Sequence, residues 1–237
     1  NHQYMLFFTQ KGKCFWMRVY EIPEGGRTAK GRAIQNLINI EQDDKVKAFI
    51  CTKDLKDDDY INNHFVIMAT KKGQVKKTSL EQYSRPRVNG INAITIKEQD
   101  ELLEANLTNG NSQVMLALKS GKAIRFEEAK TRPMGRNASG VRGIRLQNEK
   151  DEVIGMVSVN DMESNILVVS SNGYGKRSKL EDYRLTNRGG KGVKTISITE
   201  KTGDLVAIKN VDDSNGLMII NKSCLLYTSP SPRDSSP

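Results

Sequence analysis

The residues best suited to chemistry in this sequence lie between Asn187 and Gly192, where three glycines and two cations follow one another (Asn-Arg-Gly-Gly-Lys-Gly). Glycine adopts backbone conformations that a side chain forbids, so backbone N–H groups of this loop can approach a ligand closely. Arg188 and Lys191 add positive charge at the same place. The combination favours the binding of an anion. On its own it is equally typical of an ordinary polar surface loop, so the position of the loop in the chain has to decide.

Catalytic and metal-binding arrangements are not expected. His2 and His64 are isolated from each other, so they offer no Ser/His/Asp or Cys/His set and no zinc site. The run Gly173-Tyr174-Gly175 is not GxGxxG, and no Walker glycine loop is present. The three cysteines form no CxxC pair, which fits a reducing cytosol. We therefore expect no active site, no cofactor and no metal in this chain.

The cations of this sequence outnumber its carboxylates. The chain has 237 residues, with 37 Lys and Arg against 28 Asp and Glu and a formal net charge of +9. Such an excess suits a polyanionic partner, nucleic acid before a membrane surface. No segment approaches the apolar length of a transmembrane helix, and the first residues show no signal-peptide pattern. Charge alone is also typical of any basic soluble protein, so the cations have to be shown to cluster.

Four similar units follow one another along the chain. Each opens with a short apolar run, followed by a turn glycine, a strand that carries cations, and a polar connection that ends at a second glycine. The second glycine follows the turn glycine after 19, 17, 19 and 19 residues, a range too narrow for chance placement. The turn glycines are Gly12, Gly73, Gly121 and Gly173, and the second glycines are Gly31, Gly90, Gly140 and Gly192.

Each unit is expected to hold four strands. The first strands are predicted at Tyr4–Phe8, Phe65–Ala69, Val114–Leu118 and Ile166–Val169, and the second at Lys13–Arg18, around Lys76-Lys77, at Lys122–Arg125 and at Lys176–Lys179. Apolar pairs with a period of two, typical of half-buried strands, mark the third strands at Ile38/Ile40, Ile94/Ile96, Ile144/Leu146 and Ile196/Ile198. The fourth strands are predicted at Val46–Ile50, Leu102–Leu107, Val153–Val157 and Leu205–Ile208.

This pattern predicts an all-β fold. Four strands per unit, with turn glycines 61, 48 and 52 residues apart, are typical of propeller blades. The WD dipeptide and kelch signals are absent, and no sustained 3.6-residue periodicity supports an α-solenoid. The first interval is the longest because it contains an acidic insert, Lys53–Asn63, which is expected to be a solvated loop.

Cations recur in the connection before each second glycine. Because propeller blades are related by rotation, equivalent loops are expected along one rim, where they would form a continuous basic track. Phosphates suit such a track, since counterion release supplies affinity without reading sequence. Aromatic residues are scarce there, which favours duplex over single-stranded nucleic acid; a merely solvated basic face is the alternative. The candidate DNA-binding residues are Arg27, Lys30, Arg85, Arg87, Arg132, Arg136, Arg188, Gly189, Gly190, Lys191 and Gly192.

The chain from Asn1 to Ser223 resembles the C-terminal domain of the DNA gyrase A subunit, part of a type II DNA topoisomerase. The stretches that carry the resemblance include Lys76-Lys77-Thr78, the run from Gly140 to Leu146, and Asn172 to Arg177. Thr186–Gly192 is similar to the family's gyrase A box, Q-R-R-G-G-K/R-G. Thr186 and Asn187 replace its first two positions, whereas Arg188 to Gly192 match.

The resemblance implies a β-pinwheel, a propeller-like ring in which neighbouring blades exchange strands, here incomplete. It implies a basic rim that wraps double-stranded DNA so that an ATP-dependent enzyme introduces negative supercoils in the bacterial cytoplasm. The implied protein partners are the B subunit of gyrase and a second A subunit. ATP, Mg²⁺ and the catalytic tyrosine belong elsewhere in that enzyme, so Tyr83 and Tyr183 are not given that role. The family's principal box lies in the first blade, upstream of this chain, and the copy here is interpreted as secondary.

Two alternatives stay open. The related domain of topoisomerase IV has fewer or degenerate blades and lacks a true box. A basic propeller-like scaffold that binds acidic proteins would show the same charge.

The domain is assigned to residues 1–223, with about four blades and the start of another. Residues 224–237 resemble translated sequencing adapter and are expected to be disordered, because their Ser and Pro residues do not complete the hairpin begun at Leu217. A natural Ser/Pro linker is the alternative.

Overall fold

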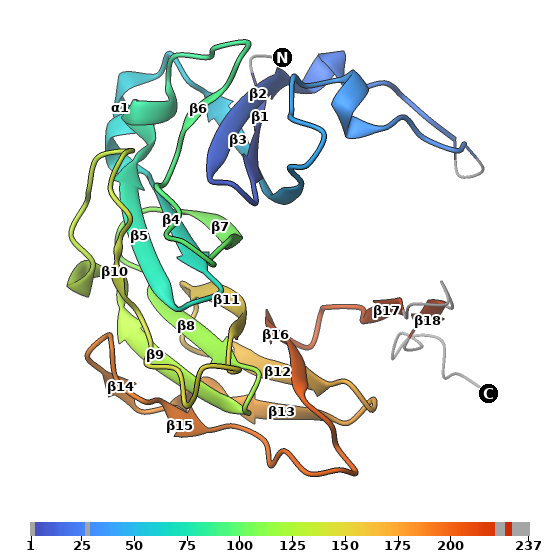
Figure 1. Cartoon of the computed structure of the whole chain (residues 1–237), viewed down its shortest axis with the longest axis vertical. Helices are drawn as coiled ribbons and strands as arrows, with labels where there is room; N and C mark the ends of the chain where they lie inside the picture. Colours follow the sequence, from blue (N-terminus) through green and yellow to red (C-terminus); the bar gives the residue numbers. More distant parts are fainter. Residues whose placement is uncertain (1–2, 27–28, 221–225, 229–237) are drawn as a thin grey trace.

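The computed structural model describes residues 3–26, 29–220 and 226–228 and places successive antiparallel sheets along an arc (Figure 1). We call the first four sheets blades. Blades 1 and 2 have four strands each, blade 3 has five and blade 4 has three. The propeller-like, all-β fold predicted from the sequence is confirmed.

The first, second and fourth strands of each unit fall close to their predicted positions. Blade 1 contains β1 (Gln3–Thr9), β2 (Lys13–Arg18), β3 (Val46–Asp54) and β6 (Ile91–Asn92). Blade 2 contains β4 (Phe65–Thr70), β5 (Gln74–Ser79), β7 (Leu102–Thr108) and β10 (Val141–Arg142). Blade 3 contains β8 (Gln113–Leu118), β9 (Lys122–Glu127), β11 (Val153–Val159), β14 (Leu185–Thr186) and β15 (Val193–Lys194). Blade 4 contains β12 (Asn165–Ser170), β13 (Gly175–Lys179) and β16 (Leu205–Val211).

Each of the first three blades receives a short strand from the next unit. β6 belongs to the second unit but pairs with β2, β10 belongs to the third but pairs with β5, and β14 and β15 belong to the fourth but pair with β9. The exchange implied by the family resemblance is therefore present in the described residues. It links consecutive blades through backbone hydrogen bonds as well as through side-chain packing.

The hydrophobic core lies between the blades. Side chains of a strand alternate between its two faces, and β4 shows the consequence: Val66 and Met68 pack in a cluster shared with blade 1, whereas Ile67 and Ala69 pack in a cluster shared with blade 3. The same alternation in β8 directs Met115 toward blade 4. Central strands are thus apolar on both faces, which explains their continuous apolar runs.

The predicted third strands are wrong in position. The exchanged strands are two residues long; β6, β10 and β15 lie just after the second glycine, and the apolar pairs beyond them are not in strands. Instead, the backbone here crosses the hairpin turn of the preceding unit. The carbonyl of Gly73 accepts from the N–H groups of Gly143 (2.8 Å) and Ile144 (3.4 Å), and the carbonyls of Gly12 and Gly121 accept in the same way. The apolar pairs therefore mark packing against a turn.

The turn glycines are needed for this crossing. Gly73 has a φ of 82°, in the left-handed region that favours glycine. A Cβ on it would also lie 2.9 Å from the carbonyl oxygen of Ile144. Gly173, at the equivalent turn of blade 4, has the same φ of 82° but no neighbour within 4 Å.

The acidic insert is not a solvated loop. It forms α1 (Asp58–Asn63), whose N-cap Asp57 accepts a hydrogen bond from the N–H of Tyr60. Tyr60 and Ile61 are buried in the cluster between blades 1 and 2. A helix of six residues is too short to show a helical period in the sequence, so periodicity does not predict it. The remaining helices of the described residues are one-turn 3₁₀ segments: η1 (Val19–Glu21), η2 (Ile34–Asn36), η3 (Leu80–Tyr83), η4 (Glu128–Lys130) and η5 (Leu180–Asp182).

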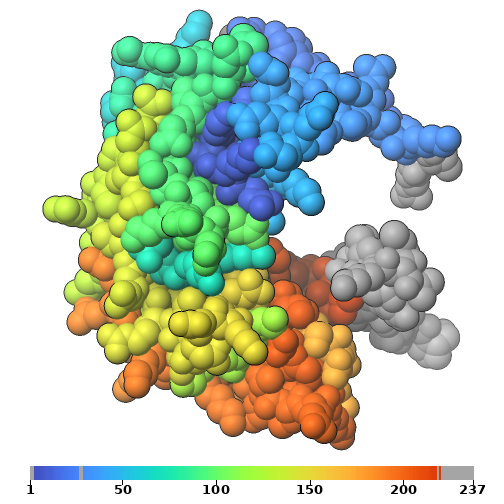
Figure 2. Space-filling model, in the orientation of Figure 1, coloured from blue at the N-terminus to red at the C-terminus, as the bar shows by residue number. Residues whose placement is uncertain are grey.

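After blade 4 the chain forms a hairpin of β17 (Met218–Ile220) and β18 (Leu226–Thr228). The expectation that the tail does not pair is thus wrong for Leu226–Thr228. The rest of 224–237 lies outside the described residues. In the space-filling view the blades form a continuous body, hollowed on the side that faces the centre of the arc (Figure 2).

Candidate nucleic-acid interface

The basic connections of units 2, 3 and 4 lie on the outer side of the arc (Figure 1). They precede the exchanged strands β6, β10 and β15, and each of the first three blades has an exchanged strand at one edge of its sheet. We call this side the outer edge. The sequence predicts equivalent basic loops along one rim, and the fold places these three connections in that way.

The connection of unit 1 differs. It projects from blade 1 (Figure 1), and only the short η1 is assigned within its described part. Lys30 is exposed there, and a Cβ on Gly31 would meet nothing within 4 Å. Arg27 lies outside the described residues. The structure therefore does not bring Lys30 together with the cations of the other connections.

The loop Asn187–Gly192, which we call the glycine-rich loop, is held between two units. The N–H of Gly189 donates to the carbonyl of Gly143 (2.6 Å), and the carbonyl of Gly190 accepts from the N–H of Arg145 (2.8 Å). Gly192 has a φ of 72°, and a Cβ on it would lie 2.6 Å from the carbonyl oxygen of Ala123. The glycines thus allow the backbone of this loop to lie in close contact with the backbone of the preceding unit.

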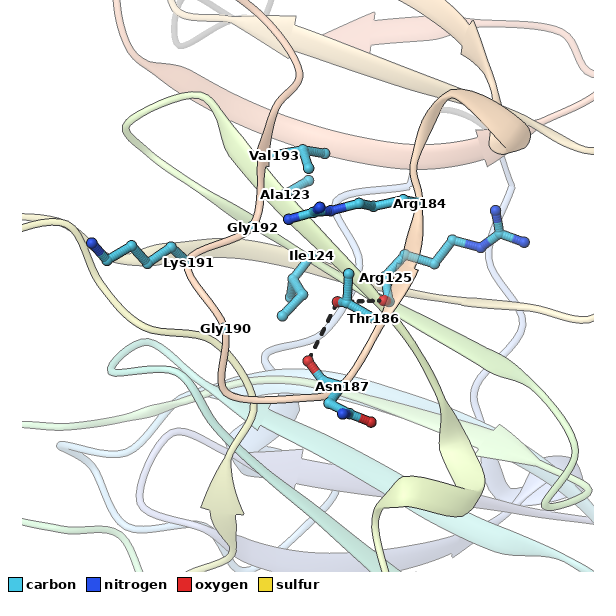
Figure 3. Close-up of a pocket in the computed structure, with 10 residues that line it drawn as sticks. All are labelled: Ala123, Ile124, Arg125, Arg184, Thr186, Asn187, Gly190, Lys191, Gly192 and Val193. Atoms are coloured by element: carbon cyan, nitrogen blue, oxygen red, sulfur yellow. Dashed lines mark hydrogen bonds between the residues drawn. The ribbon is translucent and has the colours of Figure 1, made fainter.

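The two predicted cations of this loop have different surroundings. Arg188 is half-buried, and its guanidinium donates to the carbonyls of Lys130 (3.0 Å) and Arg142 (3.1 Å). Those bonds use two of the five N–H groups of the guanidinium. Lys191 is exposed, and its side chain extends away from the loop (Figure 3). Arg188 therefore joins units, while Lys191 is available to an anion.

A small cleft of about 130 Å³ lies beside the glycine-rich loop. Arg184 extends across it toward Gly192, whereas the side chain of Arg125 points away from it (Figure 3). Arg125 donates to the carbonyls of Leu180 (2.8 Å) and Tyr183 (2.9 Å), and burial lowers its pKa. Arg184 is not among the residues predicted from the sequence, although it stands in the same connection.

The connections of units 2 and 3 meet in a second cleft, of about 300 Å³. We call it the arginine cleft; it is lined by Glu81, Gln82, Arg85, Arg87, Ile91 and Arg136. Arg85 and Arg87 are exposed, and Arg136 is half-buried. The backbone N–H of Arg136 donates to the side-chain oxygen of Gln82 (3.1 Å), which fixes this connection against η3. Arg132 is exposed but does not line the cleft.

Three arginines face one glutamate in this cleft, so it carries an excess of positive charge. Guanidinium groups bind phosphate oxygens in bidentate fashion. Further exposed cations that were not predicted from the sequence, Arg142 and Arg145, follow the second glycine Gly140. The alternation of Val141 and Arg142 in an exchanged strand is the signal that could have found Arg142. The outer edge can therefore bind a polyanion at several points.

Comparison with a known protein family divides the chain into the same four units. The DNA gyrase C-terminal domain family, described as a beta-propeller, matches residues 3–53, 64–109, 114–160 and 164–212. The DNA gyrase A subunit of Staphylococcus epidermidis (strain ATCC 12228) is 43% identical over 224 residues, which cover 94% of this chain and 24% of that protein. Its counterpart in Staphylococcus aureus (strain NCTC 8325) is also 43% identical over 224 residues, with 94% and 25% covered. The chain thus spans about a quarter of the length of these curated relatives.

Solved structures show the same arrangement. The C-terminal domain of a DNA topoisomerase IV has a TM-score of 0.84 and 25% identity, with 96% of this chain and 69% of that chain covered. A DNA gyrase A C-terminal domain has a TM-score of 0.78 and 23% identity, with 96% and 72% covered, a likeness that shows the fold alone. Among the described residues, no helix has the length and apolar character that crossing a membrane requires. Since the family matches all four units in order, the chain belongs to the DNA gyrase C-terminal domain family.

Proposed function

We propose that this chain binds duplex DNA through its phosphates along the outer edge and bends the duplex around the arc. The observation that carries the proposal is the arginine cleft, where Arg85 and Arg87 of one unit meet Arg136 of the next. Because this site is shared by successive units, a DNA strand bound there would follow the arc along which the blades are arranged. Lys191 and Arg184 extend the positive charge to the following unit.

Phosphate contact explains the residue types on this edge. Arginine and lysine contacts to phosphates position a protein on DNA without reading bases. Smooth bending of a 20–30 bp duplex by 40–90° costs on the order of 1–6 kcal/mol. Contacts that recur from unit to unit offset this cost, because each holds a further part of the curved duplex.

In a complete type II topoisomerase, with the B subunit of gyrase and a second A subunit, DNA bent in this way would present a crossing for strand passage. We propose that this chain supplies that crossing and so supports negative supercoiling. Membership of the gyrase family and the spacing of the basic connections along the arc are what support the proposal.

The proposal is tested with a fluorescent 40-bp duplex at several salt concentrations. The logarithm of the affinity should fall linearly with the logarithm of the salt concentration, by about 0.9 for each phosphate neutralised. Energy transfer between dyes on the two ends of the duplex should rise on binding, because bending brings the ends together. Duplexes of unrelated sequence should bind with similar affinity.

A competition experiment tests the rival function, a scaffold that binds acidic proteins. An acidic protein added in excess should be displaced by supercoiled plasmid. Absence of plasmid binding at low salt, together with retention of the acidic protein, would overturn DNA binding in favour of a protein-interaction scaffold.

A further inference from the structure

One ammonium group is buried directly beneath the arginine cleft. Lys76 on β5 is fully buried, and its Nζ donates to the carbonyls of Ala93 (2.5 Å) and Arg136 (2.6 Å). None of the ion pairs in the described part of the chain includes Lys76, whereas its neighbour Lys77 pairs with Glu128 at 2.8 Å. Two backbone carbonyls from different units thus bind an amino group that has no carboxylate partner among the described residues.

The groups that face Lys76 add no negative charge. The side chain of Arg136 is a second cation, and the hydroxyl of Tyr83 on η3 also donates to the carbonyl of Ala93 (3.4 Å); Cys14 on β2, a buried thiol, lies near Tyr83 and Arg136. Burial raises the pKa of Tyr83 and of Cys14, so both stay neutral near pH 7. Burial first, and the charge of Arg136 second, lower the pKa of Lys76 to about 7.

Packing does not require a lysine at this position. Lys76 stands three residues after its turn glycine, where the other units have Phe15, Ile124 and Lys176. Phe15 and Ile124 are buried apolar side chains, so the fold accepts an apolar residue there. Lys176 is exposed, and its Nζ lies 3.3 Å from the carbonyl of Thr195. A fully buried ammonium is therefore a property of the second unit.

We propose that Lys76 is a positioning residue: its buried amino group donates to the carbonyls of Ala93 and Arg136 and so holds the connection 132–140 against β5, with Arg136 in the cleft beside Arg85 and Arg87, and this hold responds to pH. The effect on DNA rests on the proposed function. The hold itself is measurable without DNA. Lys76 has no exposed surface, so it acts on a bound phosphate only through the connection that carries Arg136.

The sign of the pH response follows from proton linkage. While the connection is closed over Lys76, its pKa is about 7; when the connection lifts, water reaches the ammonium and the pKa returns toward 10.5. Lifting therefore takes up a proton between those two pH values. The closed connection gains stability as pH rises above 7, and below pH 7 this gain is absent.

Hydrogen exchange measures the lifting directly. Two amides report on the connection: the N–H of Met134 donates to the carbonyl of Lys77, and that of Arg136 donates to Gln82. After correction for intrinsic exchange, their protection should rise by up to about tenfold per pH unit from pH 7 to 9. In Lys76→Met the protection should be lower and independent of pH. Lys176→Met, at the equivalent but exposed position, should leave the wild-type rise intact.

Two further measurements keep the proposal testable if Lys76→Met does not fold. Lys76→Ile places in the second unit the residue type found at Ile124, in case the methionine variant is unfolded. NMR of the Lys76 side-chain ¹³Cε needs no variant and should show a titration midpoint near pH 7. A midpoint near 10.5, or protection of Met134 and Arg136 that does not change with pH, overturns the proposal.

DNA binding separates this inference from the proposed function. With the 40-bp duplex at pH 7.5, Lys76→Met should weaken binding several-fold while keeping the wild-type melting profile to within a few degrees. Lack of duplex binding by the wild type refutes the proposed function and leaves the exchange result standing. Wild-type affinity in Lys76→Met, with reduced amide protection, shows that the position of Arg136 does not matter to DNA and overturns the positioning role.

Discussion

Two basic regions of the outer edge, the glycine-rich loop and the arginine cleft, use their cations differently. In the loop, Arg188 commits two N–H groups to backbone carbonyls of the preceding unit, and the glycines allow the backbones to touch. In the cleft, Arg85 and Arg87 are exposed, and it is the backbone of Arg136 that is held, by Gln82 and Lys76.

The comparison shows that the most conspicuous motif of a sequence can serve to join two blades. Glycines and cations at close spacing suit an anion, but they suit the joining of two blades equally well. Charged side chains that are free of carbonyl partners remain available to phosphates. Binding should therefore depend more on the arginine cleft, and folding more on the glycine-rich loop.

Gly192→Val should have the largest effect on stability. The residue has a φ of 72°, and its Cβ would lie 2.6 Å from the carbonyl oxygen of Ala123, where β15 pairs with β9. Strain and loss of that pairing should cost about 2–4 kcal/mol, measured by urea denaturation. Gly135→Val is the matched control, because a Cβ there meets nothing within 4 Å. Equal losses in both variants would mean that close contact at Gly192 is unimportant.

Arg188→Ala should come next, with a loss of about 1–2 kcal/mol, because the carbonyls of Lys130 and Arg142 lose a charged donor. Arg184→Ala removes the same charge from an exposed position of the same connection and should change stability by less than about 0.5 kcal/mol. Thermal melts of the two variants compare them. Unchanged stability in Arg188→Ala, with weaker DNA binding, would reverse the role assigned to this residue.

Lys191→Ala should leave the melting temperature unchanged, since the side chain is exposed. It should make the salt dependence of duplex binding shallower by about 0.9, the value for one phosphate contact. Titrations of the duplex at four salt concentrations are sufficient to measure this. A slope equal to that of the wild type would restrict the binding role of this connection to Arg184.

Removal of residues 224–237 should have the smallest effect. Within the described residues, β18 pairs only with β17, and a two-stranded hairpin is marginally stable by itself. The melting temperature should therefore change by less than about two degrees. A large drop would show that the tail packs on the blades.

Much of the fold was predictable because its signals are local. Alternating apolar residues and a glycine that must adopt a positive φ both leave marks within a few residues, so the hairpins were placed correctly. The apolar pair Ile144/Leu146 was misread as a strand because its backbone partner, the carbonyl of Gly73, is far away in sequence. Alternation of apolar residues shows that one face of a segment is buried, but it does not identify which part of the chain covers that face.

The types of residue at the candidate site were predictable from the sequence, but the contacts that each residue makes were not. The recurrence of cations before each second glycine singled out Arg85, Arg87 and Arg136, which the structure brings into one cleft. It did not reveal that Arg188 meets carbonyls 46 and 58 residues away, or that Lys76 donates to the carbonyl of Arg136. Those facts depend on how one unit lies on the next, which no short stretch of sequence contains.

The most direct test of the central claim removes the arginine cleft. Arg85→Ala, Arg87→Ala and Arg136→Ala are combined and compared with a variant that loses the same charge at exposed strand turns, Lys45→Ala, Lys72→Ala and Lys97→Ala. Salt dependence and bending of the 40-bp duplex are measured for both. The cleft variant should bind with a slope shallower by about 2.7 and should bend the duplex less, because three phosphate contacts are lost at one point of the arc. The control should keep most of the wild-type slope and its bend. Equal slopes and equal bending in the two variants would contradict the account.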